Sequence, residues 1–516
     1  MNLDTQLTQL ETAQLVRRLV EEDATYMFKH ALTQDAAYES LLLKQRREIH
    51  RRIAQTIEVL YANRLDEFAA QLAQHYAQAG DDAKTLDYSI RAGDVAARAY
   101  AYREARASYT LALDALTRLP DTVEHRRHRI DTLTKHVGAS LTAASPETNA
   151  AQLAQAETLL RALPAASTPA EMSPADQQRL ARVHYWLGLV SYYANQPQDA
   201  IQHFQQVLAI ARGPNGDPDL LPIPSVVIGR VNVIQGYFNR AEALLAPAIE
   251  RLERSANWDI WTMALCFLGQ ALAGRGNYQA GVAAVERALA RAKQVNDQHS
   301  LALCHASLSI VHLIGGDIPQ MLQEGRACVE VAEPLGDRTF VYCGLGFQSW
   351  AQSRMGLIAA AIVTMDQVND LLVALGGHLV LTDLFSAASA EIALKAGQIA
   401  EAINLAEKTA TSSQVVNNIF AQGLAHRVWG QALAARNEWN ESHDHFVESL
   451  RLLEEGDARL EAARTHFAWG NALRSSGKID QARAQFDQAA AQFETSGLAR
   501  ELAEARKMVS EANNVR

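Results

Sequence analysis

The C-terminal two thirds of the sequence repeat with a period of about 40 residues, a length found in helical-repeat proteins. Small residues recur 40 or 41 positions apart at Gly188, Gly229, Gly269, Ser309, Ser349, Ala390, Gly430 and Gly470. Seven positions after each of them stands a Gly or an Asn, and both residue types tolerate positive φ. A period of this length is typical of stacked helical hairpins, none of which buries its apolar stripe alone. We therefore expect one long array with a continuous core.

The offsets within each repeat describe how its two helices meet. A small residue in the first helix lets the second approach closely, and a left-handed residue ends the first helix. A second small residue stands 12 positions after the first in every repeat except the one with Met321. An aromatic residue follows 16 positions after the first small residue at Phe204, Phe446 and Phe486.

These offsets resemble the tetratricopeptide pattern, and Trp429-Gly430 and Trp469-Gly470 fit it best. The unit is longer than the usual ~34 residues and lacks a regular closing proline. The resemblance implies an all-α, right-handed superhelical solenoid of about ten or more elongated hairpins. A HEAT-like array has a suitable repeat length but does not predict the small residues.

Composition supports helices and limits the function. Hydrophobic residues make up 48% but aromatics only 7%, so the core is rich in Ala and Leu, which favour helix. A net charge of −10 argues against binding nucleic acid by bulk charge. No apolar run approaches the ~18 residues of a membrane span, and the N-terminus does not read as a signal peptide. Four cysteines without CxxC spacing favour a reducing cytoplasm.

Prolines mark the boundaries between the predicted parts of the chain. Eight of the 13 prolines fall between Pro164 and Pro224, and none follows Pro334. We interpret Pro164–Pro174 as a linker or loop, and the second cluster, at 213–224, as an ordered loop or hinge. The predicted domains are residues 1–30, residues 31–163 as an irregular helical array, and residues 176–516 as eight regular repeats.

The N-terminal quarter carries a second and more specific resemblance. The residues that carry it are Phe28, His30, Ala31, Tyr38, Leu41, Leu42, Arg46, Arg47, His50, Ala54, Glu58, His75, Tyr76, Ala79, Gly80, Asp81, Ala92 and Gly93. With these residues the stretch is similar to the segment that joins the ATPase module to the helical-repeat arm in signal-transduction ATPases with numerous domains, especially the cyclase-associated bacterial group. Residues 1–30 then resemble the end of a winged-helix domain, with one helix and a strand at Tyr26–Phe28.

The resemblance implies a binding arm without the family's nucleotide site. No G-x-x-x-x-G-K-[ST] motif occurs, and the one Gly-Lys pair, Gly477-Lys478, lies in a repeat turn. We expect a non-enzymatic scaffold that holds a protein or small effector and regulates a partner, such as a P-loop ATPase or a cyclase module. The alternative is a transcription regulator of the maltose-activator type, and an enzyme is the third reading.

No pattern of catalytic, metal-binding or cofactor-binding residues stands out. HExxH, GxSxG and paired-carboxylate motifs are absent, so we expect no enzyme activity, no cofactor and no metal. His184, His305, His426 and His466 recur four positions before the small residue. That position faces the partner helix of its own hairpin, which favours a structural role. Cys266, Cys304, Cys328 and Cys343 lie in predicted helices, where thiols usually act as small hydrophobes.

The register of the tetratricopeptide pattern predicts which side chains line a concave groove. The predicted partner-binding set is polar and aromatic, the types enriched at interaction hot spots. It comprises Arg182, Tyr185, Tyr192, Tyr193, Arg230, Gln270, Trp350, Arg354, Glu391, Lys395, Arg427, Gln431, Arg464, Asn471 and Arg474. Tyr192 and Tyr193 have the alternative of packing between repeats.

Two basic surfaces complete the predictions. In the last two repeats, Arg427, Gln431, Arg464, Asn471 and Arg474 resemble residues with which some tetratricopeptide domains hold a peptide carboxylate. We expect an acidic segment there, unless the arginines pair with Glu461 or other local acids. Near the N-terminus, Lys44, Arg46, Arg47, Arg51 and Arg52 form the densest basic run. It is a solvated face or a docking patch for the ATPase module, with nucleic acid as the less favoured partner.

Overall fold

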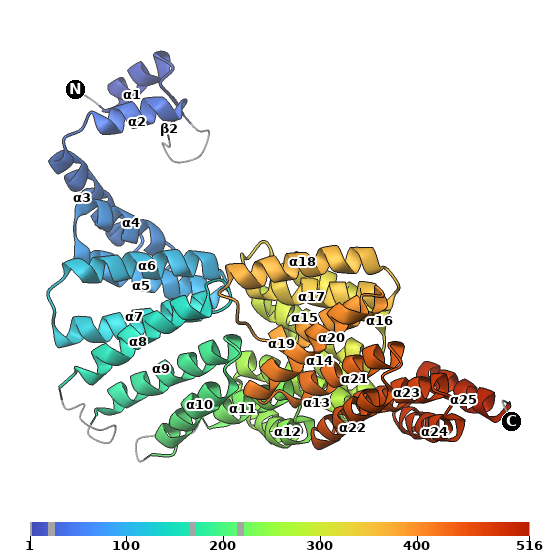
Figure 1. Cartoon of the computed structure of the whole chain (residues 1–516). Helices are drawn as coiled ribbons and strands as arrows, with labels where there is room; N and C mark the ends of the chain where they lie inside the picture. Colours follow the sequence, from blue (N-terminus) through green and yellow to red (C-terminus); the bar gives the residue numbers. More distant parts are fainter. Residues whose placement is uncertain (1–2, 19–25, 165–171, 214–220, 515–516) are drawn as a thin grey trace. The chain divides into compact units, whose positions relative to one another are not determined.

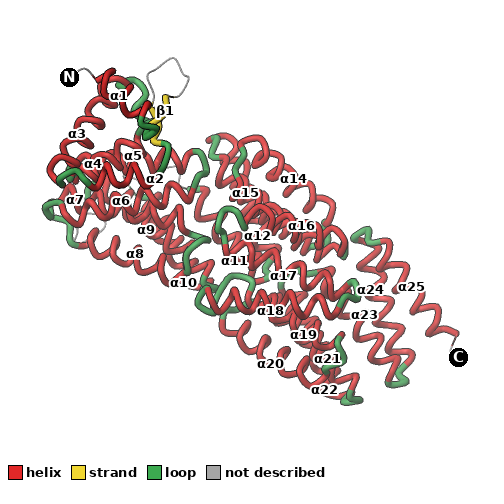
Figure 2. Tube along the Cα trace, turned by 90° about the horizontal axis from the view of Figure 1, so that it is seen from above, coloured by secondary structure: helices red, strands yellow, loops and turns green. Residues whose placement is uncertain are grey.

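Helices make up nearly all of the described chain (Figure 1). The computed structural model describes residues 3–18, 26–164, 172–213 and 221–514. Within these ranges the only strands are β1 (Val16–Arg18) and β2 (Tyr26–Phe28), which pair antiparallel with Val16 opposite Phe28 (Figure 2). The strand expected at Tyr26–Phe28 is present. No helix in the described ranges has the length and apolar character needed to cross a bilayer.

The helices follow one another with short connections. In the N-terminal part they are α1 (Leu3–Thr12), α2 (Ala31–Glu39), α3 (Leu43–Leu60), α4 (Ala69–Ala79), α5 (Asp82–Arg98), α6 (Tyr102–Arg118), α7 (Val123–Ser140) and α8 (Pro146–Arg161). The eight predicted repeats then form the hairpins α9 (Pro174–Tyr193) with α10 (Pro197–Ala211), α11 (Pro222–Gln235) with α12 (Phe238–Ser255), α13 (Trp258–Gly274) with α14 (Tyr278–Val295), α15 (Gln298–Gly315) with α16 (Ile318–Ala332), α17 (Arg338–Arg354) with α18 (Ile358–Ala374), α19 (Thr382–Lys395) with α20 (Ile399–Val415), α21 (Ile419–Ala435) with α22 (Trp439–Glu455), and α23 (Arg459–Ser475) with α24 (Ile479–Thr495). The final helix is α25 (Ala499–Asn514).

The chain divides into two compact units. The first comprises Met1–Arg98 and Glu104–His125, and the second Ala99–Arg103 and Arg126–Arg516. In the second, one apolar core extends from Leu189 to Ala505, as expected of stacked hairpins. The domain boundaries predicted at residues 30 and 163 stay predictions. The linker and hinge predicted from the prolines fall largely on residues 165–171 and 214–220, outside the described residues.

The small residues allow the two helices of each hairpin to touch. A Cβ added to Gly188 would lie 2.5 Å from the ring of Phe204, and one added to Gly470 would lie 2.6 Å from Phe486. In the hairpin of α17 and α18 the small residue is Ser349, and its hydroxyl donates to the carbonyl of Ala361 at 2.7 Å. The two offsets predicted from the sequence therefore mark the contact points between paired helices.

Left-handed residues end both helices of nearly every hairpin. All eight predicted turn residues have positive φ: Asn195, Gly236, Gly276, Gly316, Gly356, Gly397, Asn437 and Gly477. The second series ends the second helices, at Ala256, Asn296, Gly336, Gly376, Asn417, Asp457 and Gly497. Because this series includes Ala256 and Asp457, a search of the sequence for Gly and Asn alone does not find it. Several of these turns lead into buried N-caps, such as Asp297, which accepts from the amide of Ser300 at 3.1 Å.

The second unit winds tightly enough for successive superhelical turns to touch. Helix α11 contacts α21, and α13 and α15 both contact α23. Side-chain hydrogen bonds join residues 180 to 195 positions apart. With about 40 residues in each repeat, one superhelical turn takes between four and five repeats.

These cross-turn contacts connect the hairpin ends. The amide of Val380 donates to the carbonyl of Tyr193 at 2.8 Å, and the amide of Phe238 donates to that of Gly456 at 3.1 Å. Arg275 Nε donates to Asp457 Oδ2 at 2.6 Å and its Nη1 pairs with Glu242.

Candidate binding site

The structure places the predicted groove residues in two inner clusters and a few outer positions. Arg182 is exposed, with its guanidinium 4.0 Å from Asp131. Arg474 is exposed and 3.1 Å from Glu511, whereas Gln431 and Asn471 are partly buried. The other predicted residues of the set lie along the inner helices, and many of them are buried. These side chains therefore do not line an open concave groove.

The first cluster surrounds the guanidinium of Arg230 with aromatic rings. Its Cζ lies 3.7 Å from the ring centroid of Tyr192, 4.8 Å from that of Tyr193 and 4.9 Å from that of Phe267. Nη1 donates to the sulfur of Met263 at 3.4 Å. The side chain is 3% exposed. We call these residues the Arg230 cage.

The Arg230 cage has no internal counter-ion. Among the described residues, no carboxylate forms an ion pair with Arg230, and its buried Nε proton has no acceptor. Burial raises the pKa of Tyr192 to about 12 although the Arg230 cation opposes the rise, so the phenol is neutral near pH 7. The rings supply cation–π attraction but no negative charge.

Gln270, the next predicted residue along the chain, extends the cage. Its amide Nε2 donates to the hydroxyl of Ser307 at 3.0 Å, and both side chains are buried. The Oε1 atom of Gln270 has no hydrogen-bond partner. Tyr185, partly buried, packs against the same apolar core.

We call the second cluster the ion ladder. Within it, each buried arginine forms an ion pair with a carboxylate. Trp350 Nε1 donates to Glu391 Oε2 at 2.9 Å, and Arg354 binds Glu391 through Nε at 3.0 Å and Nη2 at 2.9 Å. Lys395 lies 3.3 Å from the same carboxylate. Arg354 and Glu391 are each 13% exposed.

The ladder continues through the next two repeats. Arg427 Nη1 donates to Glu461 Oε2 at 2.6 Å, and Arg464 binds the other oxygen of Glu461. Arg464 also lies 3.2 Å from Glu501. The carboxylate that we expected a ligand to bring to Arg427 and Arg464 is supplied by the chain itself, which is the alternative left open by the sequence.

Electrostatics keep the ladder acids ionised. Burial by itself raises the pKa of Glu461, but the cations of Arg427 and Arg464 outweigh it and hold that pKa at about 2. In the same way, Arg354 outweighs the burial of Glu391 and holds its pKa well below the usual range. The ladder is therefore a closed network of charges with little capacity to attract another anion.

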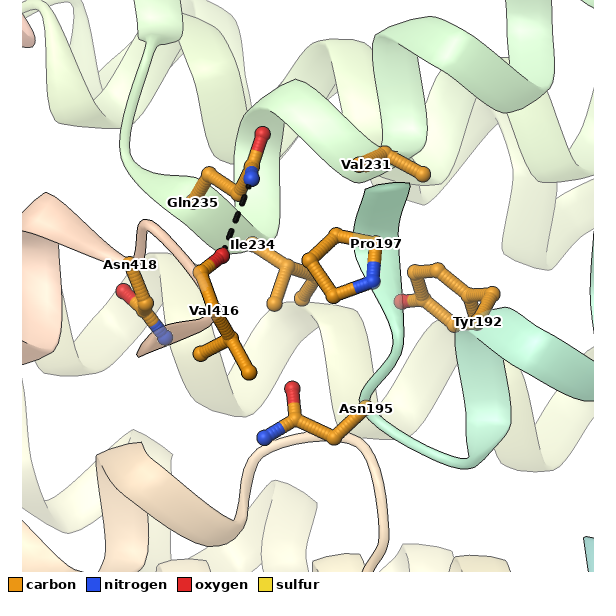
Figure 3. A pocket seen from close by; sticks show the side chains of 8 residues that line it. All are labelled: Tyr192, Asn195, Pro197, Val231, Ile234, Gln235, Val416 and Asn418. Carbon is orange, nitrogen blue, oxygen red and sulfur yellow. Dashed lines mark hydrogen bonds between the residues drawn. The ribbon is translucent and has the colours of Figure 1, made fainter. Parts of the chain in front are cut away.

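Three adjoining cavities lie beside the Arg230 cage. The first, of about 360 Å³ including its solvent-open part, is lined by Arg230, Tyr192, Tyr193, Gln270, Ser307 and Cys343 among others. The second, of about 350 Å³, runs past Ile310 and Leu384 to Asn418. The third is shown in Figure 3, where Gln235 donates a hydrogen bond to the carbonyl of Val416 and Asn418 lies beside Val416. Ile234 lines all three cavities.

The recurring histidines bond within their own hairpins, as predicted. His184 pairs with His203 at 3.1 Å, and His426 with His445 at 2.9 Å. His305 bonds Glu324, and His466 bonds Gln485, each at 2.6 Å. Each partner lies 19 positions later, on the second helix of the same hairpin.

The cysteines are free and buried. Cys266 and Cys304 come closest, with their sulfurs 3.6 Å apart. No group of three potential metal ligands occurs among the described residues.

The N-terminal basic patch lies on an exposed helix. Lys44, Arg47 and Arg52 are exposed, and Arg51 pairs with Glu48 at 3.2 Å. Arg46 is held by the carbonyls of Leu41 and Glu39 and lies over the ring of Tyr38. Ala54 is the buried residue of α3. Apolar side chains 63–82% exposed accompany the basic ones, at Leu32, Leu42, Leu43, Val59 and Leu60.

The comparisons with known proteins agree with this architecture. Residues 181–214 match the tetratricopeptide repeat family. The chain is a helical solenoid of tetratricopeptide-like repeats. No curated protein sequence matches it.

Among solved structures, a Rap protein complexed with competence and sporulation factor is similar over 72% of this chain and 99% of its own, at 9% identity and a TM-score of 0.55. The similarity to the APC/C hetero-tetramer Cut9–Hcn1 covers 93% of this chain and 95% of that chain at 13% identity, with a TM-score of 0.47. A signal-transduction ATPase with a tetratricopeptide sensor from Pyrococcus horikoshii matches over 78% and 67% at 14% identity, with a TM-score of 0.38. At 9% identity, the Rap likeness shows the fold alone.

Sequence reasoning missed the residues that complete each cluster. Phe267 and Met263 belong to the Arg230 cage but occupy positions of α13 that read as ordinary core. Glu501 lies on α25, beyond the last predicted repeat. The repeat register of the inner helices found the arginines, because each falls at one of the positions that the register directs inward, but gave no information on contacts between turns.

Proposed function

We propose that this chain is a non-enzymatic interaction scaffold, the sensor or interaction arm of a signalling ATPase system. It holds a protein or small effector and regulates a partner module. The tetratricopeptide-like repeats support the scaffold role, since arrays of this kind present extended binding surfaces. The Rap protein with the same fold was solved in complex with competence and sporulation factor, which supports effector binding as a use of such an array.

The observation that carries the docking part of the proposal is the exposed face of α2 and α3. Leu32, Leu42, Leu43 and Val59 are more than 60% exposed, and Lys44, Arg47 and Arg52 of α3 are exposed as well. Large exposed apolar side chains are a feature of interaction sites. We propose the P-loop ATPase or a cyclase module as the partner, with Lys44, Arg47 and Arg52 contacting its acidic residues.

Site-specific crosslinking tests this docking surface. A photo-crosslinking residue at Leu43 or Val59, introduced in the native cell, is expected to capture a protein that contains a P-loop or cyclase domain. The matched control is Val415, which is 82% exposed on the second unit. Capture of such a partner at Val415 alone, or of unrelated proteins at all three sites, would contradict the proposal.

The outer residues of the last repeats offer a second contact. Arg474 is 40% exposed and its pair with Glu511 is a surface ion pair of little net stability. An acidic partner segment replaces Glu511 at little cost, with Asn471 and Gln431 nearby on α23 and α21 as additional hydrogen-bonding groups. Arg474→Ala is expected to weaken binding of the crosslinked partner at low salt and to have less effect at high salt.

The alternative, a transcription regulator, depends on the same basic residues. It predicts salt-dependent binding of duplex DNA that is lost in a Lys44→Ala/Arg47→Ala/Arg52→Ala variant. The interaction-arm proposal predicts no such binding. A gel-shift titration at two salt concentrations distinguishes the two functions.

A further inference from the structure

The Arg230 cage and its cavity form a site that the docking surface does not use. The guanidinium is 3% exposed and lines a cavity, and its Nε proton lacks an acceptor. In the same wall, Gln270 Oε1 lacks a donor although the side chain is only 2% exposed. Buried polar atoms are normally satisfied, and Arg230 and Gln270 line the same cavity, so their two unsatisfied atoms point to a polar partner there.

The charge of the site determines the class of that occupant. Arginine stays protonated even when buried, so the cavity wall carries a full positive charge. The surrounding Tyr192, Tyr193 and Phe267 contribute ring faces, and the described residues contribute no paired carboxylate. A buried cation is stabilised by a neighbouring anion. A planar carboxylate is able to accept two parallel hydrogen bonds from the edge of a guanidinium.

The remainder of the cavity determines the shape of the occupant. Away from Arg230 and Gln270, the walls are apolar, with Ile234, Leu303 and Ile310 among the lining residues. The neighbouring cavity continues along Ile234 and Ile310. One guanidinium in an apolar setting suits a monoanion with an apolar body better than a phosphate dianion, which needs several cations.

We propose that this cavity binds a small organic monocarboxylate, with its carboxylate at Arg230 and its apolar body directed along Ile234 and Ile310. Rotation of the Gln270 amide lets the hydroxyl of Ser307 donate to Oε1, which frees the NH2 group to donate to the ligand. The inference rests on the proposed sensor function for its biological role and names the class of effector. The cage joins α9, α11 and α13, so an occupant there contacts three repeats at once.

Calorimetric titration of the full chain with hexanoate tests the proposal. Wild type is expected to bind hexanoate more tightly than it binds butyrate. It is expected to bind hexanamide, the uncharged counterpart of hexanoate, at least tenfold more weakly than hexanoate. Arg230→Gln is expected to reduce hexanoate affinity at least tenfold. Arg287→Gln is the matched control, because Arg287 also lies over a ring, Trp261, but is exposed.

Each outcome either supports or overturns the carboxylate site. Absence of hexanoate binding by wild type overturns the proposal, as does equal binding by wild type and Arg230→Gln. If Arg230→Gln fails to fold, Arg230→Lys keeps the charge but loses the planar edge, and an affinity equal to that of wild type overturns the proposed contact. Crosslinking at α3 is independent of this titration, so failure of either experiment leaves the other result intact.

Discussion

Arg230 and Glu391 occupy the same position of two different repeats, one residue after the small residue. The charge of Glu391 is paired with cations, whereas the charge of Arg230 is not paired with an acid in the described part of the chain. Glu391 is held by Arg354, Lys395 and Trp350 in the ion ladder. Arg230 lies among aromatic rings with no acid. The shared register shows that the array accommodates a buried charge at this position, and the neighbours decide whether that charge is already neutralised.

This difference separates a structural role from a binding role. A paired buried charge contributes to stability only through its partner, whereas an unpaired one is destabilising until something neutralises it. The presence of a buried Arg230 without an acidic partner therefore points to a ligand. The paired charges of the ion ladder instead connect neighbouring repeats. The predictions below test the two halves of this comparison.

The largest effect is expected from removing one member of the ladder. Arg354→Met leaves the buried Glu391 carboxylate without its main partner and is expected to lower the free energy of unfolding by about 3–5 kcal/mol. The double variant Arg354→Met/Glu391→Met is expected to recover most of this loss, because both charges are gone. Urea denaturation measures both values, and a double variant as unstable as the single one would contradict the pairing.

Acid is expected to weaken the ladder region before the Arg230 cage. The pKa of Glu461 is lowered to about 2 in the folded chain from an ordinary 4.5. A lowered carboxyl pKa stabilises the fold above the ordinary pKa, and that stability is lost as pH falls from 4.5 towards 2, by roughly 3 kcal/mol. Hydrogen exchange is expected to show α21 and α23 opening in this window ahead of α11. Equal protection of all three helices would contradict the prediction.

A smaller effect is expected at milder acidity. Burial, together with the neighbouring His445, lowers the pKa of His426 to about 4 from 6.5. The unfolded chain then binds the proton more readily, so the free energy of unfolding falls as pH decreases from 6.5 to 4, by less than the ~3 kcal/mol of the full shift because the ring is partly exposed. His426→Gln is expected to flatten the stability profile in this range without altering the loss below pH 4. An unchanged slope would show that other groups titrate there.

The smallest effect is expected at the cage. Arg230→Met removes a buried cation and also its cation–π contacts, two opposing contributions of similar size. We expect the free energy of unfolding to stay the same or to rise by about 1 kcal/mol in the absence of ligand. Thermal denaturation measures this, with Arg354→Met as the comparison. A loss above about 2 kcal/mol would assign Arg230 a structural role.

The helical hairpins could be predicted from the sequence because they depend on local contacts. Gly188 against Phe204, and the left-handed turn at Asn195, are pairings within one hairpin and leave a fixed spacing in the chain. The inner position of Arg230 and Glu391 follows from the same spacing. The register also placed His426 against the second helix of its hairpin.

The closed interior could not be predicted. The pitch of a solenoid is the sum of small rotations at every repeat, and no single spacing records it. Trp350 and Arg427 therefore read as groove residues, whereas they are 1% and 6% exposed and bind Glu391 and Glu461 of the next repeat. The partner acids were equally hidden, because Glu461 and Glu501 lie outside the register that identifies inward positions.

The hydrogen bonds between turns, such as Asn195 to Asp383 and Arg275 to Asp457, have a consequence for how this array is able to evolve. An open solenoid tolerates duplication or loss of a single repeat, because each unit meets only its neighbours. Here the insertion of one further repeat between Arg275 and Asp457 would place every later hairpin end opposite the wrong one. We therefore expect the number of repeats between such contacts to be constrained as a whole, with length changes tolerated best outside them.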